Sequence, residues 1–360
     1  MRVSTVGVFL YFLILAYGSF SLLWAYDPLN TLVQLVEWVS MGVVFFYIPI
    51  LLKNEETTDQ MLRFLFLALF ILEGMRLAGM VVEYVKAQDY VRIRYSGFLS
   101  SMGFLLFTAA LFSGVEWKPK WLLYVCGFFF GTMVVISLTR TIWIGTVLAV
   151  MLQLAAFASL RNIMRVLLIT AAIVSLITVL CRVSPLFKEK FLGRKIPLLT
   201  AKINSQLKGI GGRYAAYRTM VDVIKDHPLG IGFGGYQRMF HDRYEKIFLS
   251  YHPGRSPVGA HSGLVYHLVE FGMLGFLPLF FLLFRPLRLV GLARRFLMNR
   301  AMSWCVVWGI GLWVVSVCKY FLEASNFERR FSMFFTLALA EFIFCTWQKH
   351  DPDAIAKKTT

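Results

Sequence analysis

Residues 121–160 read WLLYVCGFFFGTMVVISLTRTIWIGTVLAVMLQLAAFASL, and Arg140 is the only charged residue among them. Each half is long enough to cross a hydrocarbon layer of about 30 Å as a helix, which takes roughly 20 apolar residues. An irregular chain cannot cross, because its backbone polar groups would be unpaired in lipid. The stretch therefore predicts two membrane helices that meet in a tight turn at Thr139, Arg140 and Thr141.

The same apolar character extends over most of the 360 residues. Hydrophobic residues make up 58% of the sequence and the mean hydropathy is +0.66, which would overfill the core of a soluble protein. We predict an all-α, polytopic membrane helical bundle of about ten transmembrane helices. The first predicted span is followed by no small-residue cleavage site, so we interpret it as a membrane helix and not as a secretory signal. The predicted spans are residues 5–24, 31–52, 61–82, 97–114, 121–138, 141–160, 165–183, 262–284, 303–322 and 331–347.

Charged loops predict the orientation of these spans. Residues 285–300 carry five arginines and no acidic residue, which places this loop in the cytoplasm by the positive-inside rule. Both termini then lie in the cytoplasm, and the long loop 184–260 and the turn at Arg140 lie on the outer side. The predicted units are a first membrane bundle, the outer loop, the last membrane helices and a cytoplasmic tail, over residues 1–183, 184–260, 261–350 and 351–360.

The outer loop is strongly basic, with thirteen Lys and Arg against five Asp and Glu in residues 184–260. One explanation is that long loops escape the positive-inside rule. The other is an anionic ligand at the outer surface, such as a lipid-linked phosphate or diphosphate. The net charge of +17 does not indicate nucleic acid, because the cations are divided between two sides of a membrane whose lipids they also contact.

Five of the six histidines lie between Gly211 and Gly275, and we expect any chemistry here: they are His227, His241, His252, His261 and His267. Within this segment, residues 213–226 place Tyr214, Tyr217, Val221 and Ile224 on one helix face and predict an amphipathic helix at the membrane surface. The dipeptide His227-Pro228 ends this helix, because a residue before proline is driven out of the helical region.

Glycines 230, 232 and 235 match the GxGxxG pattern of dinucleotide-binding proteins. No strand precedes them and no βαβ unit surrounds them, so we reject that interpretation. We expect these glycines to permit a tight loop that passes close to other backbone or to a ligand.

Two positions at the outer side have the chemistry of a phosphate site. Arg140 offers a planar fork of donors suited to phosphate oxygens, although an arginine at such a turn can also simply reach the interface. His261 lies at the start of a span, where unpaired backbone N–H groups favour anions and a histidine can act as acid or base. The alternative for His261 is an ordinary polar cap.

The remaining polar residues of the spans have structural explanations beside functional ones. Glu73 and Arg76 are three residues apart and can form an ion pair within one helix, either as part of a site or as a link between helices. The five cysteines lie in or beside apolar spans without CxxC spacing, so we interpret them as core residues: they are Cys126, Cys181, Cys305, Cys318 and Cys345. No acidic cluster suited to a divalent cation stands in the outer loop, and we expect neither a metal nor a cofactor.

The order of these motifs resembles a known family. An arginine in a tight outer turn is followed by Gly212-Arg213 with Tyr217, then by HPLGIGFGGY at 227–236, and then by His261 opening a helix that contains Glu270. This order is similar to that of the O-antigen ligase and polymerase (Wzy_C-type) superfamily of bacterial membrane glycosyltransferases. The chain has Tyr217 where the family usually has tryptophan, and serine after His261 where the family often has asparagine. The resemblance covers roughly residues 121–285.

The resemblance implies a GT-C-like enzyme of the bacterial inner membrane whose active site faces the periplasm. It implies a polyprenyl-diphosphate-linked glycan as donor, with Arg140 and Arg213, and more weakly Arg218, binding the diphosphate. It implies His261 as the base that takes the proton of the acceptor hydroxyl. The supporting residues that we expect are Tyr217, His252 and Glu270.

We predict most simply an O-antigen ligase of lipopolysaccharide biosynthesis, which moves a glycan from undecaprenyl diphosphate to lipid A core with inversion and without a metal. The basic loop suits a phosphorylated core acceptor. The same site suits a repeat-unit polymerase, whose acceptor is another glycan. A transporter of lipid-linked glycans is a third possibility and would need charges along a path through the bundle, with Glu73, Arg76, Lys319 and Glu341 as candidates.

Overall fold

The computed structural model describes residues 5–51, 55–87, 97–137, 139–156, 215–251, 262–286 and 300–322, and five single positions between 164 and 182. Within these ranges the chain is helical and contains no strand, which confirms the predicted all-α class. The predicted spans 165–183 and 331–347 lie wholly or almost wholly outside the described residues. The number of ten spans therefore stays a prediction.

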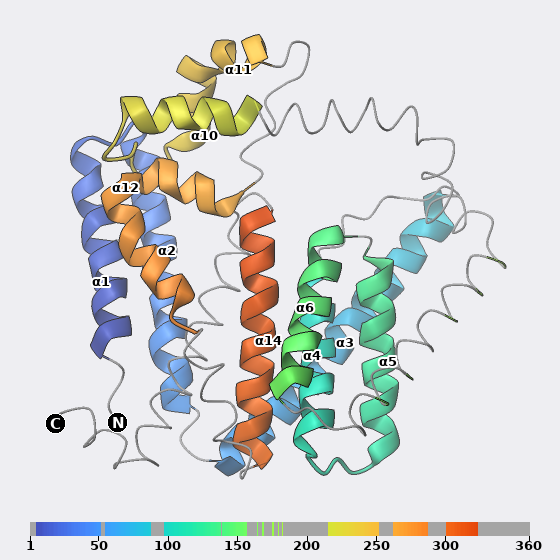
Figure 1. Cartoon of the computed structure of the whole chain (residues 1–360). Coiled ribbons are helices and arrows are strands. Elements are labelled where there is room, and N and C mark those ends of the chain that lie inside the picture. The colour runs from blue at the N-terminus through green and yellow to red at the C-terminus, as the bar shows by residue number, and fades with distance from the viewer. Residues whose placement is uncertain are drawn as a thin grey trace.

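Four helices between residues 55 and 156 pack around α14 or beside it and form, with α14, the larger part of the bundle (Figure 1). α14 (Arg300–Leu322) contacts α3, α4, α6 and α12, while α5 packs against α4 and α6. Most residues of the apolar stretch Ser303–Tyr320 of α14 are buried inside the protein, whereas most of those in α3 are not. α14 is therefore the central helix. The bounds of the others are α3 (Glu55–Ala87), α4 (Phe98–Ser113), α5 (Lys120–Ile136) and α6 (Arg140–Ala156).

The predicted tight turn between two spans is present between α5 and α6. α5 ends at Ile136 and α6 begins at Arg140, so three residues connect them. Ser137 fixes the turn, because its hydroxyl donates to the Val134 carbonyl at 2.7 Å and accepts from the Thr139 N–H at 3.4 Å. Arg140 thus occupies the first position of α6.

A second group consists of the N-terminal hairpin and α12. α1 (Thr5–Phe20), the short 3₁₀ turn η1 (Ser21–Leu23) and α2 (Pro28–Leu51) form the hairpin, and α1 contacts α12 (Gly263–Phe284). The sequence predicts one span over 262–284, but the helix bends at Gly272, whose φ of 64° and ψ of −177° are not helical. In Figure 1 the first part of α12 lies across the end of the bundle near the end of α14, and the second part runs alongside α1.

We call the end of the molecule where α4, α6 and α12 begin and α14 ends the loop end. Residues 215–251 lie there and are largely helical (Figure 1). Helix 215–226 stops before His227, as the sequence predicts. It is followed by α10 (Tyr236–Met239), the π-helical turn η3 (Phe240–Tyr244) and α11 (Glu245–Tyr251). The charged segment after the glycines is therefore a nearly continuous helix with one π turn.

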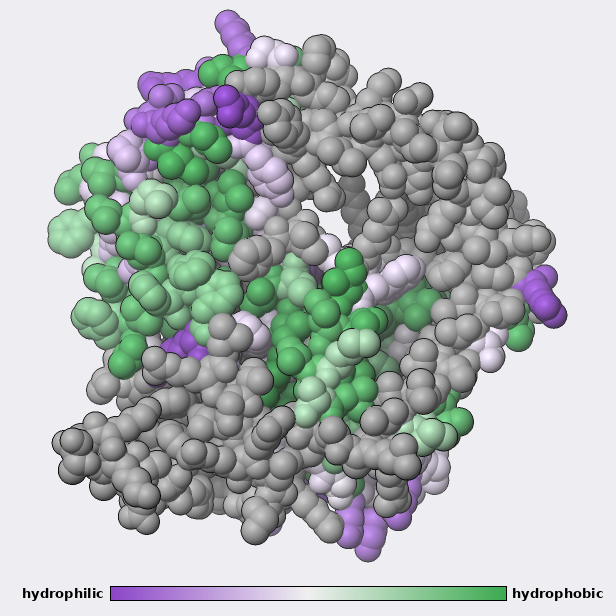
Figure 2. Space-filling view, in the orientation of Figure 1, coloured by the Kyte–Doolittle hydropathy of each residue, from purple (hydrophilic) through white to green (hydrophobic). Residues whose placement is uncertain are grey.

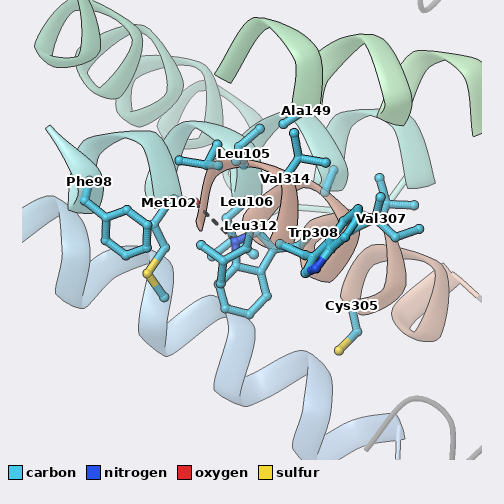
Figure 3. Close-up of a cluster of buried hydrophobic side chains, with 14 of the residues drawn as sticks. Phe98, Met102, Leu105, Leu106, Ala149, Cys305, Val307, Trp308, Leu312 and Val314 are labelled. Atoms are coloured by element: carbon cyan, nitrogen blue, oxygen red, sulfur yellow. Dashed lines mark hydrogen bonds between the residues drawn. The ribbon is translucent and has the colours of Figure 1, made fainter. Parts of the chain in front are cut away.

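The core of the bundle is apolar, and hydrogen bonds from tryptophan indole N–H groups connect its helices (Figure 3). The Nε1 groups of Trp304 and Trp308 on α14 donate to the Leu106 and Met102 carbonyls of α4 at 2.9 and 3.2 Å. Gln153 of α6 is buried and bonds to both neighbouring helices, with Nε2 3.1 Å from the Val307 carbonyl and Oε1 2.6 Å from Thr108 Oγ1. Each tryptophan places a large apolar ring in the core and a donor on a neighbouring backbone.

Four of the described helices are long and apolar enough to cross a membrane: they include Val6–Leu23, Glu56–Val82, Gly263–Phe284 and Ser303–Tyr320. Three shorter apolar helices cover Phe98–Ser113, Lys120–Ile136 and Thr141–Ala155. Figure 2 shows apolar residues spread over the side formed by the N-terminal hairpin and α12, and hydrophilic residues at the loop end around α10 and α11 and also at the opposite end of the molecule. This distribution fits a multi-pass membrane protein with a polar cap.

Two further predictions can be checked in this bundle. Cys126 and Cys305 are buried free thiols and Cys318 is partly buried and free, as expected of core residues, while Cys181 and Cys345 lie outside the described residues. The Nη1 atom of Arg76 lies 3.5 Å from Oε1 of Glu73 on the same face of α3. This distance confirms that the two residues can form an ion pair.

Candidate functional site

Residues 228–235, between His227 and α10, form a glycine-rich loop that packs into the bend of α12 at Gly272. At the bend, the carbonyls of Val269 and Glu270 are released from the helical pattern and accept from the N–H groups of Ile231 and Gly232, both at 3.2 Å. In return, the Met273 N–H donates to the Pro228 carbonyl at 3.2 Å. The loop thereby satisfies backbone groups that the broken helix would leave unpaired.

Glycine is required on both sides of this contact. Gly230 has a φ of 78°, and a Cβ at this position would overlap the Glu270 carbonyl oxygen and the Gly272 nitrogen. Gly272 has a φ of 64°, and its own Cβ would overlap the backbone of Leu229 and Gly230. The prediction of a tight loop that passes close to other backbone is therefore confirmed.

The N-terminal hairpin holds the other side of the same loop. The Tyr17 hydroxyl donates to the Leu229 carbonyl and the Thr31 hydroxyl to the Phe233 carbonyl, both at 2.7 Å. Asn30 Nδ2 donates to the Gly234 carbonyl, and the Tyr26 N–H to the Ile231 carbonyl at 2.9 Å. These contacts show that the first two predicted spans position the glycine-rich loop.

An aromatic cluster lies beneath the loop and the first part of α12. Phe233 of the loop stacks on Phe271 of α12 with ring centroids 4.2 Å apart, and Trp38 of α2 lies within 6 Å of both rings. His267 joins this cluster through contacts with Trp38 and Phe271 at 5.9 and 5.2 Å. Stacked and tilted rings at these distances stabilise the loop on α12 and α2.

His267 also connects α12 to α14. Its Nδ1 atom lies 2.8 Å from the Gly263 carbonyl and 2.9 Å from the Tyr320 hydroxyl, and the side chain is fully buried. Ser262 caps the helix, because its hydroxyl oxygen accepts from the Val265 N–H at 3.4 Å. The first turn of α12, which directly follows His261, is thus fixed from both sides.

Four of the predicted site residues have no described side chain. Arg140 begins α6, but its side chain is not among those described. Arg213, His252 and His261 lie outside the described residues, next to helix 215–226, α11 and α12 respectively. Their roles therefore stay predictions, and what the structure adds is the position of the elements that carry or adjoin them.

Tyr217, Arg218 and Glu270 are described. Tyr217 and Arg218 lie on the exposed face of helix 215–226, and the opposite face, with Ala216 and Met220, packs inward. Of the apolar face predicted to meet the membrane surface, Tyr217 and Val221 point away from the protein, while Ile224 packs against the core of the loop end. Glu270 is buried, and its backbone carbonyl accepts a hydrogen bond from the Gly232 N–H of the glycine-rich loop. Glu270 is therefore part of the packing at the bend.

The loop end has a small hydrophobic core of its own. Met220 and Val223 pack with Tyr236, Phe240 and Phe248, along with other members of the cluster. This core joins helix 215–226 to α10, η3, α11 and, through Val269, to α12.

Polar contacts lie at the edge of this small core. Tyr244 donates to Asp226 at 2.6 Å, and burial together with this hydrogen bond raises the pKa of Tyr244. Further contacts tie α10 and η3 to the hairpin: Arg238 lies 3.5 Å from Asp27, and Tyr26 donates to Asp242 at 2.9 Å.

Three helix termini meet around the last turns of α14. A Cβ on Gly145 of α6 would lie 3.1 Å from Val315 Cα, and a Cβ on Gly263 of α12 would lie 2.9 Å from the Tyr320 ring. At the start of α4, Phe98 lies under Lys319, with Nζ 4.7 Å from the ring centroid. The helix that begins with Arg140 and the helix that follows His261 therefore both contact the end of α14.

Within the described ranges, no group of three or more His, Cys, Asp or Glu side chains is placed to hold a metal ion. The polar groups described at the loop end are instead tyrosines bonded to aspartates, an arginine paired with Asp27, and backbone amides that bond to the bend of α12.

The apolar helices with a polar site at one end define a multi-pass membrane protein. Residues 125–281 match the model of the family described as O-antigen ligase (Wzy_C), which confirms the resemblance drawn from the motifs. No curated protein matches the chain. The matched segment is thus similar to the O-antigen ligase and polymerase type, and it contains α6, the glycine-rich loop and most of α12.

Proposed function

We propose that this protein transfers a glycan from undecaprenyl diphosphate to an acceptor hydroxyl at the periplasmic face of the bacterial inner membrane. The acceptor that we propose is lipid A core, which makes the protein an O-antigen ligase. The basic loop 184–260 supports this choice, because a phosphorylated core is anionic. A repeat-unit polymerase would use the same donor and would differ only in its acceptor.

The observation that carries the proposal is the meeting of α6 and α12 at the end of α14. The two family motifs are more than one hundred residues apart in sequence, but each lies at the start of one of these helices. Arg140 is the first residue of α6, and His261 directly precedes Ser262, the N-cap of α12. Their helices contact the same two turns of α14. This arrangement supports one site that combines a phosphate-binding arginine with a base.

The proposed reaction is a single displacement. The acceptor oxygen attacks the anomeric carbon, the bond from that carbon to the diphosphate oxygen breaks with its electron pair, and His261 takes the hydroxyl proton. Attack opposite the leaving group inverts the anomeric configuration. Arg140 and Arg213, assisted by Arg218, neutralise the charge that grows on the diphosphate.

In this proposal the supporting residues have structural roles and no chemical role. The backbone carbonyl of Glu270 holds the glycine-rich loop, which lies between α12 and the N-terminal hairpin. Tyr217 and Arg218 face outward on helix 215–226, where they meet the membrane surface and the headgroup of the donor. His252 follows α11 by one residue and stays a further polar group of the same loop.

The test uses purified protein in nanodiscs with labelled undecaprenyl-diphosphate glycan. Addition of lipid A core should give a glycosylated core with inverted configuration and free undecaprenyl diphosphate, without any ion gradient. Product that instead consists of lengthened lipid-linked glycan would identify a polymerase. Absence of any covalent product, with movement of the donor across the bilayer of a proteoliposome, would contradict the proposal in favour of a transporter.

A further inference from the structure

We propose that Tyr320, in the last turn of α14, is a positioning residue that holds the proposed base His261 at a fixed place relative to Arg140. This inference rests on the proposed function and deepens it, because it names a residue that acts through another. Tyr320 lies beyond residue 281, where the segment that matches the family ends. In the sequence it is an ordinary aromatic residue near the end of a predicted span, and its role follows from its contacts.

The first part of α12 depends on its neighbours for its direction. The bend at Gly272 separates residues 263–271 from the rest of the helix, so the second part does not fix the direction of the first. At the bend, the glycine-rich loop holds the first part through the carbonyls of Val269 and Glu270. The other end, which closely follows His261, is the end that Tyr320 contacts.

Tyr320 contacts the beginning of α12 in two ways. Its hydroxyl oxygen lies 2.9 Å from Nδ1 of His267, and the same Nδ1 lies 2.8 Å from the Gly263 carbonyl oxygen. Because a carbonyl oxygen only accepts, Nδ1 carries a proton that these two oxygens share. The residue also lies against Gly263, where a Cβ would come within 2.9 Å of the Tyr320 ring and 3.0 Å of its carbonyl oxygen. The side chains of Tyr320 and His267 are both buried, so this junction is closed to water.

The same end of α14 supports the helix that begins with Arg140. A Cβ on Gly145 of α6 would lie 3.1 Å from Val315 Cα and 3.3 Å from Cys318 Cβ. Arg140 precedes Gly145 by about one and a half turns of α6. The position of His261 relative to Arg140 is therefore set by two contacts with α14, one made by α12 and one made by α6.

A second contact between α12 and α14 provides a comparison. Trp313 Nε1 donates to the Leu283 carbonyl at 2.9 Å, and Leu283 belongs to the second part of α12. α14 is thus bonded to α12 on both sides of the bend, and Tyr320 is bonded to the part that follows His261. A role in stability alone predicts similar consequences for the two contacts, whereas a positioning role predicts that turnover depends on Tyr320.

Turnover is sensitive to the position of the base. A base must lie within hydrogen-bond reach of the proton that it takes, and a displacement of about 1 Å can cost about 10²-fold in rate. Donor binding is proposed to use arginines on other elements and does not require the base. Loss of the Tyr320 hydroxyl should therefore lower kcat and leave the affinity for the donor unchanged.

The test compares purified variants in nanodiscs with labelled undecaprenyl-diphosphate glycan as donor and lipid A core as acceptor. Tyr320→Phe keeps the ring against Gly263 and removes only the hydroxyl, and it should lower kcat about 10-fold with an unchanged Kd for the donor. The matched control is Trp313→Phe, which removes a hydrogen bond between the same two helices together with part of a buried ring. It should lower the melting temperature at least as much as Tyr320→Phe does and keep the kcat of the wild type.

A Tyr320→Phe protein with the kcat of the wild type would overturn the inference, and so would an equal loss of kcat in Trp313→Phe. If Tyr320→Phe loses its melting transition, Gly263→Ala displaces the start of α12 from the Tyr320 ring, and the same criteria apply to it. A wild type that forms no product contradicts the proposed function, and the inference fails with it. A wild type that forms product while Tyr320→Phe matches its kcat contradicts the inference alone.

Discussion

The bundle around α14 and the glycine-rich loop are held together in different ways. The bundle is fastened by side chains, with tryptophans and Gln153 donating across an apolar core. The loop is fastened by its backbone, which exchanges hydrogen bonds with the bend of α12 and accepts donors from the N-terminal hairpin. Substitutions in the bundle should therefore reduce stability, whereas substitutions around the loop should reduce activity first.

The largest effect should follow from filling the bend of α12. Gly272→Ala adds a Cβ that overlaps the backbone of Leu229 and Gly230 and requires a φ of 64° that alanine disfavours. We expect the loop to leave the bend and glycan transfer to be lost, in an assay of product formation. Gly74→Ala is the control, because a Cβ on this residue of α3 would have no neighbour within 4 Å. A Gly272→Ala protein with normal transfer would contradict the docking of the loop.

The next largest effect concerns the proposed diphosphate site. Arg140→Ala and Arg213→Ala should each lower turnover by about 30- to 10³-fold, since a charged donor in a water-poor site contributes about 2–4 kcal/mol to the transition state. Arg→Lys at either position should recover little, because the planar fork is lost. If both alanine variants turned over normally with intact folding, these arginines would have to be assigned to membrane anchoring.

A pair of substitutions separates the two regions directly. Thr31→Val removes the hydroxyl that donates to the Phe233 carbonyl at 2.7 Å, and turnover should fall about 3- to 10-fold, as loss of roughly 1 kcal/mol predicts. Gln153→Leu removes three buried contacts in the bundle and should lower the free energy of unfolding by about 1–3 kcal/mol while turnover is kept. Unfolding and turnover are measured on the same purified samples. The reverse outcome for either variant would remove the distinction between the regions.

The smallest effect should come from the edge of the loop core. Tyr244→Phe removes the hydrogen bond to Asp226 and should cost about 0.5–1.5 kcal/mol of stability with little change in turnover. Because burial raises the folded-state pKa of Tyr244 above its unfolded value, the neutral phenol stabilises the fold below about pH 10, and this contribution is lost at higher pH. Thermal unfolding followed from pH 8 to 11 should show a smaller loss for Tyr244→Phe than for the wild type. An equal loss would show that Tyr244 is not the group that titrates.

The sequence predicts much of the bundle because long apolar runs carry their own length and period. α1, α4, α5, α12 and α14 all fall on predicted spans, and the stop at His227-Pro228 and the close approach of Gly230 were also expected. These features depend on local chemistry, namely hydropathy, proline and glycine.

Other features depend on contacts between distant segments and leave no local pattern. Thr31 and Tyr17 look like ordinary residues of membrane helices, yet their hydroxyls hold carbonyls about two hundred residues away. Gly272 lies in a largely apolar run that also contains His267 and Glu270, and hydropathy alone does not reveal the bend there. Lys319 resembles any lysine at the end of a span until its burial over Phe98 is known.

The central claim is that the loop end carries out glycosyl transfer with His261 as base. The most direct measurement compares purified His261→Ala with His227→Ala, which alters a histidine at the end of helix 215–226. A positioned base contributes about 10²- to 10⁴-fold in rate, so His261→Ala should lose turnover by this factor and keep its affinity for undecaprenyl-diphosphate glycan, while His227→Ala should keep both. A His261→Ala protein that transfers glycan at the wild-type rate would contradict the account.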